Sequence, residues 1–161
     1  MGENIKLVEF IDEKGVTIHE LASRMGISPR TIKRYLRELE EKGLIESRDG
    51  LYLLTPVGVK FKKALEVVKS RKEASPYIVT DPFSGNIVPL SFKNYRQLLA
   101  IIENELVDKK ILDEHVRKYL IEWVKTSIGD EYLVYLLENN IVKNVDDLKE
   151  YLSMILKTID G

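Results

Sequence analysis

The chain has 161 residues, of which 44% are hydrophobic and 32% are charged, and its formal net charge is −1. This length allows one sizeable core or two small ones, and the composition is that of a globular protein rich in ion pairs. No run of about 18 apolar residues is present, so we expect no transmembrane helix. The N-terminus lacks the apolar stretch of a secretory signal, and there is no cysteine to form a disulfide or a thiolate metal site. We therefore expect a cytoplasmic protein.

Charge is distributed unevenly along the chain. Residues 1–74 contain 15 Lys and Arg against 12 Asp and Glu, whereas residues 75–161 contain 10 against 14. A basic N-terminal part and an acidic C-terminal part predict two modules, 1–74 and 75–161, with any polyanion binding in the first.

The first two predicted helices are short. One spans residues 3–14, with Ile5, Val8 and either Leu7 or Ile11 facing inward, and ends at Gly15. The second opens at Thr17 and Glu20, which have the spacing of a capping box. It buries a stripe and ends at a glycine suited to a left-handed turn; these residues are Ile18, Leu21, Ala22, Met25 and Gly26.

The third predicted helix, residues 28–42, has the clearest functional signal. Ser28 is a good N-cap, and Pro29 occupies the first helical position, where a missing N–H costs nothing. Ile32, Leu36 and Leu39 form one apolar stripe. Four cations lie on the other side: Arg30, Arg34 and Arg37, with Lys33 on their flank. A helix of this kind, preceded by a tight turn, fits the major groove of DNA.

A hairpin and a fourth helix follow. Residues 44–47 and 51–54 are predicted strands joined by Arg48-Asp49-Gly50, because Asp-Gly between β-prone runs is a strong hairpin signal. Thr55-Pro56 then caps a helix that runs to about Glu73, with Val57, Phe61, Ala64, Leu65 and Val68 on one side. Three helices, a short hairpin and a helix are the order of a winged helix-turn-helix.

The stretch TIHELASRMGISPRTIKRYLRELEEKGLIES, followed by LYLLTPVG, resembles the winged helix-turn-helix domains of prokaryotic transcriptional regulators, archaeal ones in particular. The resemblance covers residues 3–73. It implies DNA binding, usually as a dimer, with the third helix in the major groove and the hairpin tip near the backbone or minor groove. The hairpin is short, with Arg48 as its only cation, so its contact with the minor groove would be slight.

A β-prone segment, residues 77–90, opens the second module. Tyr77–Thr80 and Asn86–Leu90 flank the loop Asp81–Gly85, which predicts either a small hairpin or an extended arm. We expect a simple turn with Phe83 buried; the alternative is part of a small-molecule pocket or a protein-binding edge.

The remainder is predicted to be helical. One helix begins at Ser91 and ends near Lys110, and the next runs from Asp113 to Ser127. A third occupies 130–140, and the last begins at the cap Asn144. The residues expected to be buried are Tyr95, Leu98, Leu99, Ile101, Ile102, Leu106, Val116, Tyr119 or Leu120, Trp123, Val124, Leu133, Leu136, Leu137, Leu148, Tyr151 or Leu152, Ile155 and Ile159. Trp123 with Tyr119, Tyr132 and Tyr135 could instead line an effector pocket, but packing in the core is favoured.

The predicted site residues divide by role. The N-terminal part of a recognition helix faces base edges, so Arg30, Thr31 and Arg34 are candidates for direct readout. Ser28, Lys33, Arg37 and Arg48 are candidates for phosphate contacts. The competing interpretation is a solvated face with pairs such as Arg34–Glu38 and Arg37–Glu41; the capped turn before the helix and the hairpin after it favour DNA.

Enzyme chemistry is not expected. His19 and His115 are the only histidines, and neither has a convergent set of metal ligands or catalytic partners in the sequence. Phosphate-binding glycine loops and common hydrolase or protease motifs are also absent. We predict no catalytic residue, no metal and no cofactor.

The sequence thus predicts a mostly α protein, with an N-terminal winged helix and a C-terminal all-helical module joined by a short β-prone segment. Its predicted function is a homodimeric, sequence-specific regulator that binds double-stranded DNA. The dimer contact would come from the helix at 56–73, from the C-terminal module, or from both. The C-terminal module could also bind a small-molecule effector or a protein of the transcription machinery. The alternative function is an adaptor in a transcription or replication complex, whose winged helix binds protein.

Overall fold

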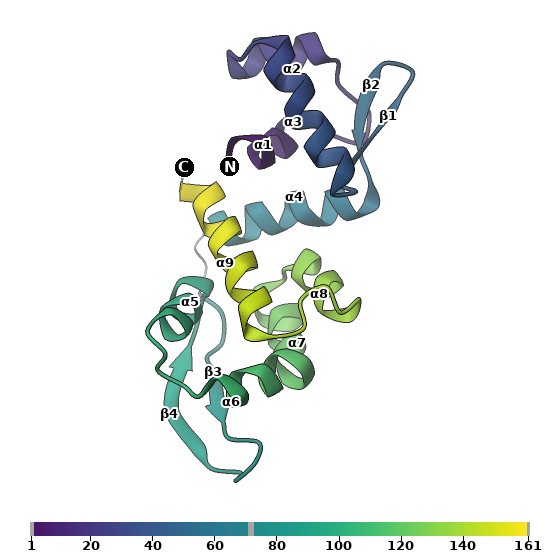
Figure 1. Ribbon diagram of the computed structural model, residues 1–161. Coiled ribbons are helices and arrows are strands. Elements are labelled where there is room, and N and C mark those ends of the chain that lie inside the picture. Colours follow the sequence, from purple (N-terminus) through teal and green to yellow (C-terminus); the bar gives the residue numbers. More distant parts are fainter. Residues whose placement is uncertain (1, 71–72, 161) are drawn as a thin grey trace. The chain divides into compact units, whose positions relative to one another are not determined.

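A computed structural model describes residues 2–70 and 73–160 (Figure 1). The chain is mostly helical, with two small antiparallel sheets of two strands each, which confirms the predicted fold class. The described residues form two compact units, 2–63 and 64–160. The boundary that the sequence places after residue 74 stays a prediction.

The first unit contains the winged helix. Its elements are α1 (Gly2–Lys6), a 3-10 turn η1 (Leu7–Phe10), α2 (Ile18–Met25), α3 (Pro29–Glu41), β1 (Ile45–Arg48) and β2 (Leu51–Leu54). Helix α4 (Pro56–Lys69) begins in this unit and ends in the second. The core is mostly aliphatic and is built from every element; fully buried members include Leu7, Ile11, Leu21, Ile32, Leu36, Leu39 and the aromatic Phe61.

The first helix is shorter than predicted. The side chain of Asp12 and strand β2 form hydrogen bonds with backbone groups that would otherwise continue the helix. Helical structure ends at Phe10, and Ile11 is extended. The carboxylate of Asp12 accepts hydrogen bonds from the N–H groups of Lys14 and Gly15, at 2.8 and 2.9 Å, a local turn that competes with the helix. Val16 then pairs with Tyr52 of β2 through N···O distances of 3.0 and 2.9 Å.

Helices α2 and α3 begin and end as predicted. The hydroxyl of Thr17 accepts from the N–H of Glu20 at 3.2 Å. Gly26 ends α2 at φ 65°, in the left-handed region that glycine adopts without strain. The hydroxyl of Ser28 caps α3 by accepting from the N–H of Thr31 at 3.3 Å, which starts the third helix after a very tight turn.

The backbone carbonyl of Leu44, just before the hairpin, lies against the start of α4. Strands β1 and β2 pair from Ile45↔Leu54 to Arg48↔Leu51. The Leu44 carbonyl accepts from the N–H of Thr55 at 3.0 Å, and the Thr55 hydroxyl accepts from the N–H of Gly58 at 3.0 Å. A Cβ at Gly58 would lie 1.9 Å from the Leu44 carbonyl oxygen. Residue 58 therefore has to be glycine for α4 to approach β1 this closely.

Helix α4 ends at Lys69, before the predicted end near Glu73. Residues 71–72, which the prediction included, lie outside the described residues. Ala74 is already non-helical, and its N–H donates to the carbonyl of Lys93 at 3.0 Å. Ser75 precedes a proline, which disfavours the α conformation at that position.

After the end of α4, the second unit continues with a hairpin, one of the two alternatives left open by the sequence. Strands β3 (Tyr77–Thr80) and β4 (Ile87–Phe92) pair antiparallel with an irregularity in the register. Helices α5 (Tyr95–Glu103), α6 (Lys109–Glu114), α7 (Leu120–Trp123), α8 (Glu131–Glu138) and α9 (Val145–Asp160) follow. Two π-helical turns, η2 (His115–Tyr119) and η3 (Val124–Ile128), flank α7, so residues 109–128 form one continuous helical rod.

The predicted helix from Ser91 to Lys110 is wrong at both ends. β4 extends through Phe92, and α5 starts only after Asn94, whose side chain caps it by accepting from the N–H of Gln97 at 2.8 Å. Glu105 takes φ 51°, which interrupts the helix. As a result Leu106 is 53% exposed rather than buried.

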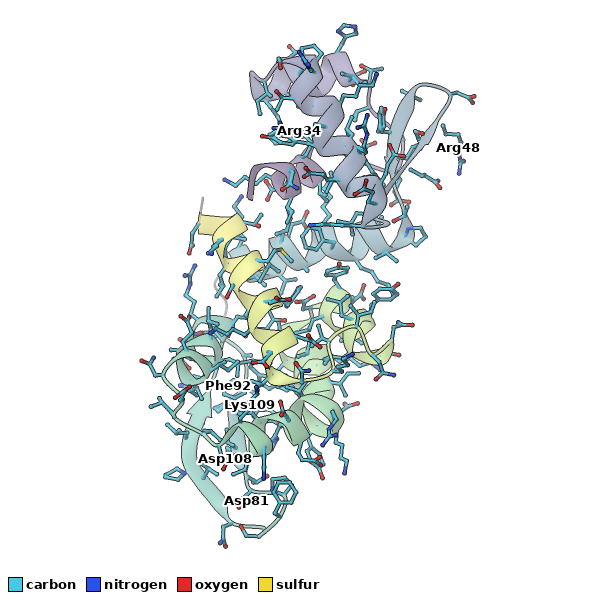
Figure 2. All side chains as sticks on the ribbon, viewed as in Figure 1. Arg34, Arg48, Asp81, Phe92, Asp108 and Lys109 are labelled. Atoms are coloured by element: carbon cyan, nitrogen blue, oxygen red, sulfur yellow. The ribbon has the colours of Figure 1, made fainter. Side chains whose placement is uncertain are left out.

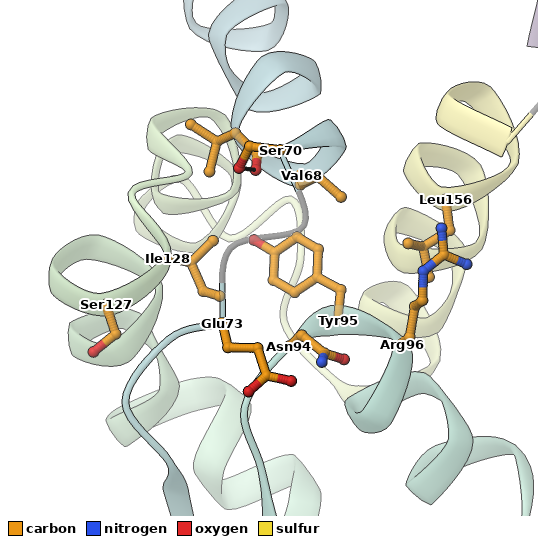
Figure 3. A pocket seen from close by; sticks show the side chains of 10 residues that line it. Val68, Ser70, Glu73, Asn94, Tyr95, Arg96, Ser127, Ile128 and Leu156 are labelled. Carbon is orange, nitrogen blue, oxygen red and sulfur yellow. Dashed lines mark hydrogen bonds between the residues drawn. The ribbon is translucent and has the colours of Figure 1, made fainter.

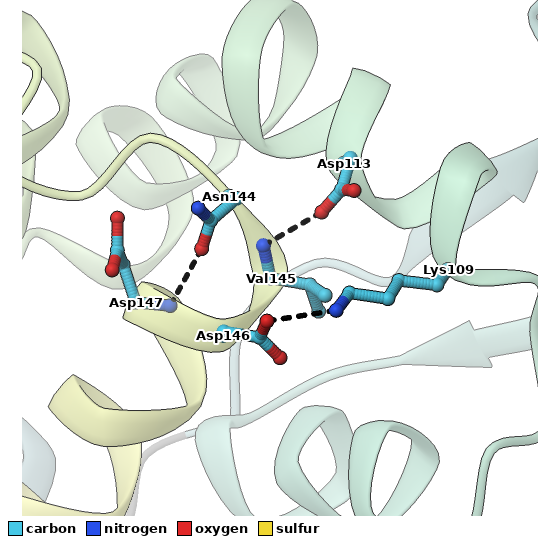
Figure 4. Close-up of polar contacts among 6 residues, drawn as sticks. All are labelled: Lys109, Asp113, Asn144, Val145, Asp146 and Asp147. Carbon is cyan, nitrogen blue, oxygen red and sulfur yellow. Dashed lines mark hydrogen bonds and ion pairs between the residues drawn. The ribbon is translucent and has the colours of Figure 1, made fainter.

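The following helix starts earlier than predicted. Asp108 rather than Asp113 is its N-cap, accepting from the N–H of Lys110 at 2.8 Å. Asp113 instead accepts from the N–H of Val145 at 2.8 Å, and Lys109 forms an ion pair with Asp146 at 2.7 Å, so the start of α9 is held against α6 (Figure 4). Of the two alternatives, Leu120 is buried and Tyr119 is 49% exposed.

An aromatic cluster forms the core of the second unit. The ring of Trp123 packs edge-on against Tyr77 and Phe92, with centroids 5.9 and 5.1 Å apart. Its indole N–H donates to the carbonyl of Ser75 at 2.7 Å. Trp123 is thus a core residue, as favoured, and its ring neighbours come from the hairpin and α5, whereas Tyr132 and Tyr135 stack on each other.

A buried carboxylate, which was not predicted from the sequence, holds α5, α8 and α9 together. Asp130 is fully buried and accepts hydrogen bonds from the hydroxyls of Tyr95 and Tyr151, both at 2.6 Å, and from the N–H of Leu133 at 2.9 Å. Burial raises the pKa of Asp130 above its ordinary value, although the three donors oppose that change. Burial also raises the pKa of both tyrosines, so their hydroxyls remain donors.

Replacing Asp130 with alanine is expected to destabilise the second unit by about 2–4 kcal/mol, because a helix cap is lost and two buried hydroxyls lose their acceptor. Asp108→Ala removes only an exposed cap and should cost about 1 kcal/mol. Urea unfolding followed by the fluorescence of Trp123, the single tryptophan of the chain, measures both changes in one unit. Equal losses for the two variants would contradict the role given to Asp130.

Candidate nucleic-acid interface

The third helix presents its cations to solvent. Ile32, Leu36 and Leu39 are buried in the first unit, and this fixes the opposite face of α3 outward. Four side chains are exposed there, as predicted: Arg30, Lys33, Arg34 and Arg37. Figure 2 shows Arg34 on this helix.

The charges of α3 are arranged against the helix dipole. All four cations lie in its first nine residues, whereas its acids, Glu38, Glu40 and Glu41, lie at the C-terminal end. The N-terminus of a helix carries a partial positive charge, so cations there and acids at the other end both lower helix stability slightly. An arrangement that costs stability indicates another use, and an anion held in front of the helix is the use that its chemistry allows.

Those cations are not neutralised within the described part of the chain. The pairs expected from a solvated face, Arg34–Glu38 and Arg37–Glu41, are not formed. Glu38 accepts instead from the amide of Asn4 at 2.5 Å. The guanidinium of Arg34 lies over the ring of Tyr35, 5.3 Å from its centroid, which holds the arginine on the helix surface without using its hydrogen-bond donors.

Ser28 and Thr31 are already engaged with each other. The hydroxyl of Ser28 donates to that of Thr31 at 3.0 Å while it caps the helix, and Thr31 is half-buried. Arg48 ends β1 beside the Asp49-Gly50 turn and forms an ion pair with Glu46 at 2.8 Å, with its side chain 69% exposed (Figure 2). This ion pair was not predicted from the sequence, and it reduces the positive charge at the tip of the β1–β2 hairpin. DNA contact by all seven predicted residues stays a prediction.

Neither histidine belongs to a cluster of catalytic groups. His19 is exposed at the start of α2. His115 is buried: its Nε2 donates to the carbonyl of Thr80 at 2.6 Å, and its Nδ1 accepts from the Tyr77 hydroxyl at 2.5 Å. Burial raises the pKa of Tyr77, so the hydroxyl keeps its proton. Among the described residues, no group of three His, Asp or Glu side chains could hold a metal ion.

The second unit contains a cavity of about 480 Å³ (Figure 3). Apolar side chains and the ring of Tyr95 line part of it, and polar groups line the rest. Its lining residues are Val67, Val68, Ser70, Glu73, Asn94, Tyr95, Arg96, Ser127, Ile128 and Leu156. Arg96 is paired with Asp160 through two hydrogen bonds of 3.0 and 2.6 Å. The aromatic pocket considered from the sequence is not this one, because Trp123, Tyr119, Tyr132 and Tyr135 do not line it.

None of the described helices is both long and apolar enough to cross a bilayer.

Four known proteins share parts of this sequence, and two of them are riboflavin kinases, from Pyrococcus abyssi and Pyrococcus furiosus. The arabinose metabolism transcriptional repressor of Geobacillus stearothermophilus is 31% identical over 140 residues, 80% of this chain and 37% of the repressor. The HTH-type transcriptional regulator GlpR of Haloferax volcanii is 44% identical over 55 residues, 33% of this chain and 22% of that protein. A riboflavin kinase of Pyrococcus abyssi is 39% identical over 74 residues, 44% of this chain and 35% of the kinase.

The chain thus spans between about a fifth and two fifths of the length of these curated relatives. No solved structure matches it. Residues 3–75 match the family described as the HVO_A0261 N-terminal domain. With the order of elements seen in the first unit, these matches confirm the resemblance that the sequence predicted. The fold of the first unit and the matched segment, residues 3–75, are similar to the winged helix-turn-helix domains of prokaryotic transcriptional regulators.

Proposed function

We propose that this protein is a transcriptional regulator that binds double-stranded DNA sequence-specifically through α3, as a homodimer in the cytoplasm. The observation that carries the proposal is the exposed cationic face on the N-terminal half of a capped helix, whose side chains form no ion pair with any described residue. Two of the relatives are named as transcriptional regulators, which supports the same function. The riboflavin kinases share only about a third of their length with this chain, and the proposed regulator is not an enzyme.

The roles of individual residues follow from position. Arg30 and Arg34 would face base edges, where arginine pairs bidentately with guanine, and Thr31 would contact a neighbouring base. Lys33, Arg37, Ser28 and Arg48 would contact phosphates. Two recognition helices related by a two-fold axis would meet successive major grooves, so the target should be an inverted repeat with half-sites one helical turn apart.

The cavity of the second unit is the place where we propose that a small-molecule effector binds. Its volume of about 480 Å³ lies in the range of small-molecule sites. Its mixed lining suits a ligand with an apolar body and polar groups. Binding there would leave α3 available for DNA, because none of the lining residues belongs to the first unit.

Selection of bound duplexes from a random library, followed by titration of the winner at several salt concentrations, tests the DNA proposal. We expect an enriched inverted repeat. If Lys33, Arg37 and Arg48 of both protomers neutralise phosphates, the slope of log K against log salt should be about −5. No enrichment together with a flat salt response would reject the proposal and favour the adaptor, whose winged helix binds protein.

A further inference from the structure

The hairpin β3–β4 carries large apolar side chains on both of its faces. Val79 and Phe92 are fully buried against the helices, and Tyr77 packs on Phe92 with ring centroids 5.0 Å apart. On the opposite face Ile78 is 58% and Ile87 is 70% exposed. Sheets with one face in water alternate apolar and polar residues, whereas strands covered on both faces are apolar throughout. The outer face of this hairpin thus exposes two large apolar side chains next to the uncharged Thr80 and Ser91.

The exposed apolar side chains form one surface. The cross-strand pairs Thr80↔Ile87 and Ile78↔Ser91 place both isoleucines on the same side. Pro89 is exposed as well, in the irregular part of β4, where a missing N–H is tolerated. At the tip, Phe83 is 69% exposed, which contradicts the prediction that it would be buried in its turn. We call Ile78, Phe83, Ile87 and Pro89 the hairpin surface.

Charge is nearly absent from this segment. In a chain that is 32% charged, residues 76–92 contain one charged side chain, Asp81 (Figure 2). Its carboxylate accepts from the N–H of Phe83 at 2.9 Å, within its own loop, and this bond lowers the pKa of Asp81. A charged partner would find almost nothing to pair with here. The partner that fits must itself be apolar and uncharged, and a second copy of the chain presents such a surface by symmetry.

We propose that the hairpin surface packs against the hairpin surface of a second copy across a two-fold axis, and that this contact forms the dimer. The inference rests on the homodimer in the proposed function and names its interface. With strands about 4.8 Å apart, the outer face of two strands covers only a few hundred Å², less than the roughly 800 Å² per partner of a standard interface. The dimer is therefore weak in solution, and a DNA site with two half-sites strengthens it by raising the effective concentration.

Sedimentation velocity of the full chain, over micromolar to submillimolar concentrations, tests the inference. The double variant Ile78→Glu/Ile87→Glu places like charges across the axis and removes two apolar contacts, so self-association should weaken at least about a hundredfold. The matched control is Leu106→Glu/Ile141→Glu, which changes equally exposed residues of the same unit, 53% and 54%, by the same charge. The variant Ile78→Thr/Ile87→Thr keeps β propensity and guards against misfolding, which Trp123 fluorescence reports.

The expected result is reversible dimerisation of the wild type and the control, and loss of it in both hairpin variants. A wild type that stays monomeric at all concentrations would overturn the inference, as would hairpin variants that associate like the wild type or a control that loses association equally. Titration of a DNA half-site with each protein separates the two proposals. Half-site affinity unchanged within twofold in the Thr variant supports a role of the hairpin in association alone, whereas absence of DNA binding in every protein rejects the regulator without touching the dimer contact.

Discussion

Replacing Arg30 and Arg34 with alanine is expected to abolish sequence-specific DNA binding while leaving the fold intact. A bidentate arginine–guanine pair is worth about 1–3 kcal/mol, so losing two in each protomer should weaken specific binding at least about a thousandfold. Both side chains are exposed, and α3 keeps its cap and apolar stripe without them. Alanine is the best helix former, and removing cations from the helix N-terminus is mildly favourable. The melting temperature should therefore stay nearly the same.

The control for this experiment removes the same charge elsewhere in the first unit. Lys14→Ala/Lys42→Ala changes two exposed cations that lie away from the N-terminal half of α3. Competition titrations against the selected duplex and against unrelated DNA should show that only the arginine variant loses discrimination. Equal affinity of the arginine variant and the wild type for the selected duplex would reject α3 as the recognition helix.

Gly58→Ala should destabilise the first unit by about 3 kcal/mol, although the same change at an ordinary helix position stabilises by nearly 1 kcal/mol. The new Cβ would come within 1.9 Å of the Leu44 carbonyl oxygen and 2.9 Å of its carbon. Both are backbone atoms, so no side chain can rotate away, and α4 has to move from the hairpin. Helix propensity alone would make Gly58→Ala stabilising. A measured loss of stability therefore reports the close approach of α4 to the Leu44 carbonyl.

Hydrogen exchange of residues 2–63 measures the effect of Gly58→Ala, while Trp123 fluorescence follows the second unit separately. Lys63→Ala, an exposed change in the same helix, should stay within about 0.5 kcal/mol of the wild type. Gly26→Ala should cost about 1 kcal/mol, since φ is 65° there but no atom lies within 4 Å of the added Cβ. A Gly58→Ala protein as stable as the wild type would show that α4 does not need this contact.

The parts of the fold that follow from local chemistry were predictable. Thr17 and Ser28 cap their helices, and Asp49-Gly50 forms the turn, because each acts on backbone groups a few residues away. The exposed cations of α3 followed from its apolar stripe in the same way. The pair of Arg48 with Glu46 did not, because a strand places residues two apart on one side and either could have turned to solvent.

The predictions that are wrong concern residues whose conformation or burial depends on contacts with distant parts of the chain. Ser91 could cap a helix, but pairing with Ile78 keeps it in a strand. Asp130 has the sequence of an ordinary cap; only the fold brings it the hydroxyls of Tyr95 and Tyr151, which are 35 and 21 residues away. Phe83 was expected to be buried on hydrophobicity alone, which says nothing about whether the covering surface belongs to the same chain.

The π-helical turn η2 of the 109–128 rod accounts for part of an unusual spacing. The buried residues of the rod include Leu112, Val116, Leu120 and Val124, which repeat every four positions. In an α-helix each step of four overshoots a full turn by about 40°, so the last of these side chains would point about 120° away from the first. The wider turn η2, which lies between Leu112 and Leu120, absorbs part of that drift and brings the four side chains closer to one line, whereas η3 begins only at Val124. Losing one residue from either turn would rotate everything beyond it by about a quarter turn or more, so this rod tolerates substitution far better than a change of length.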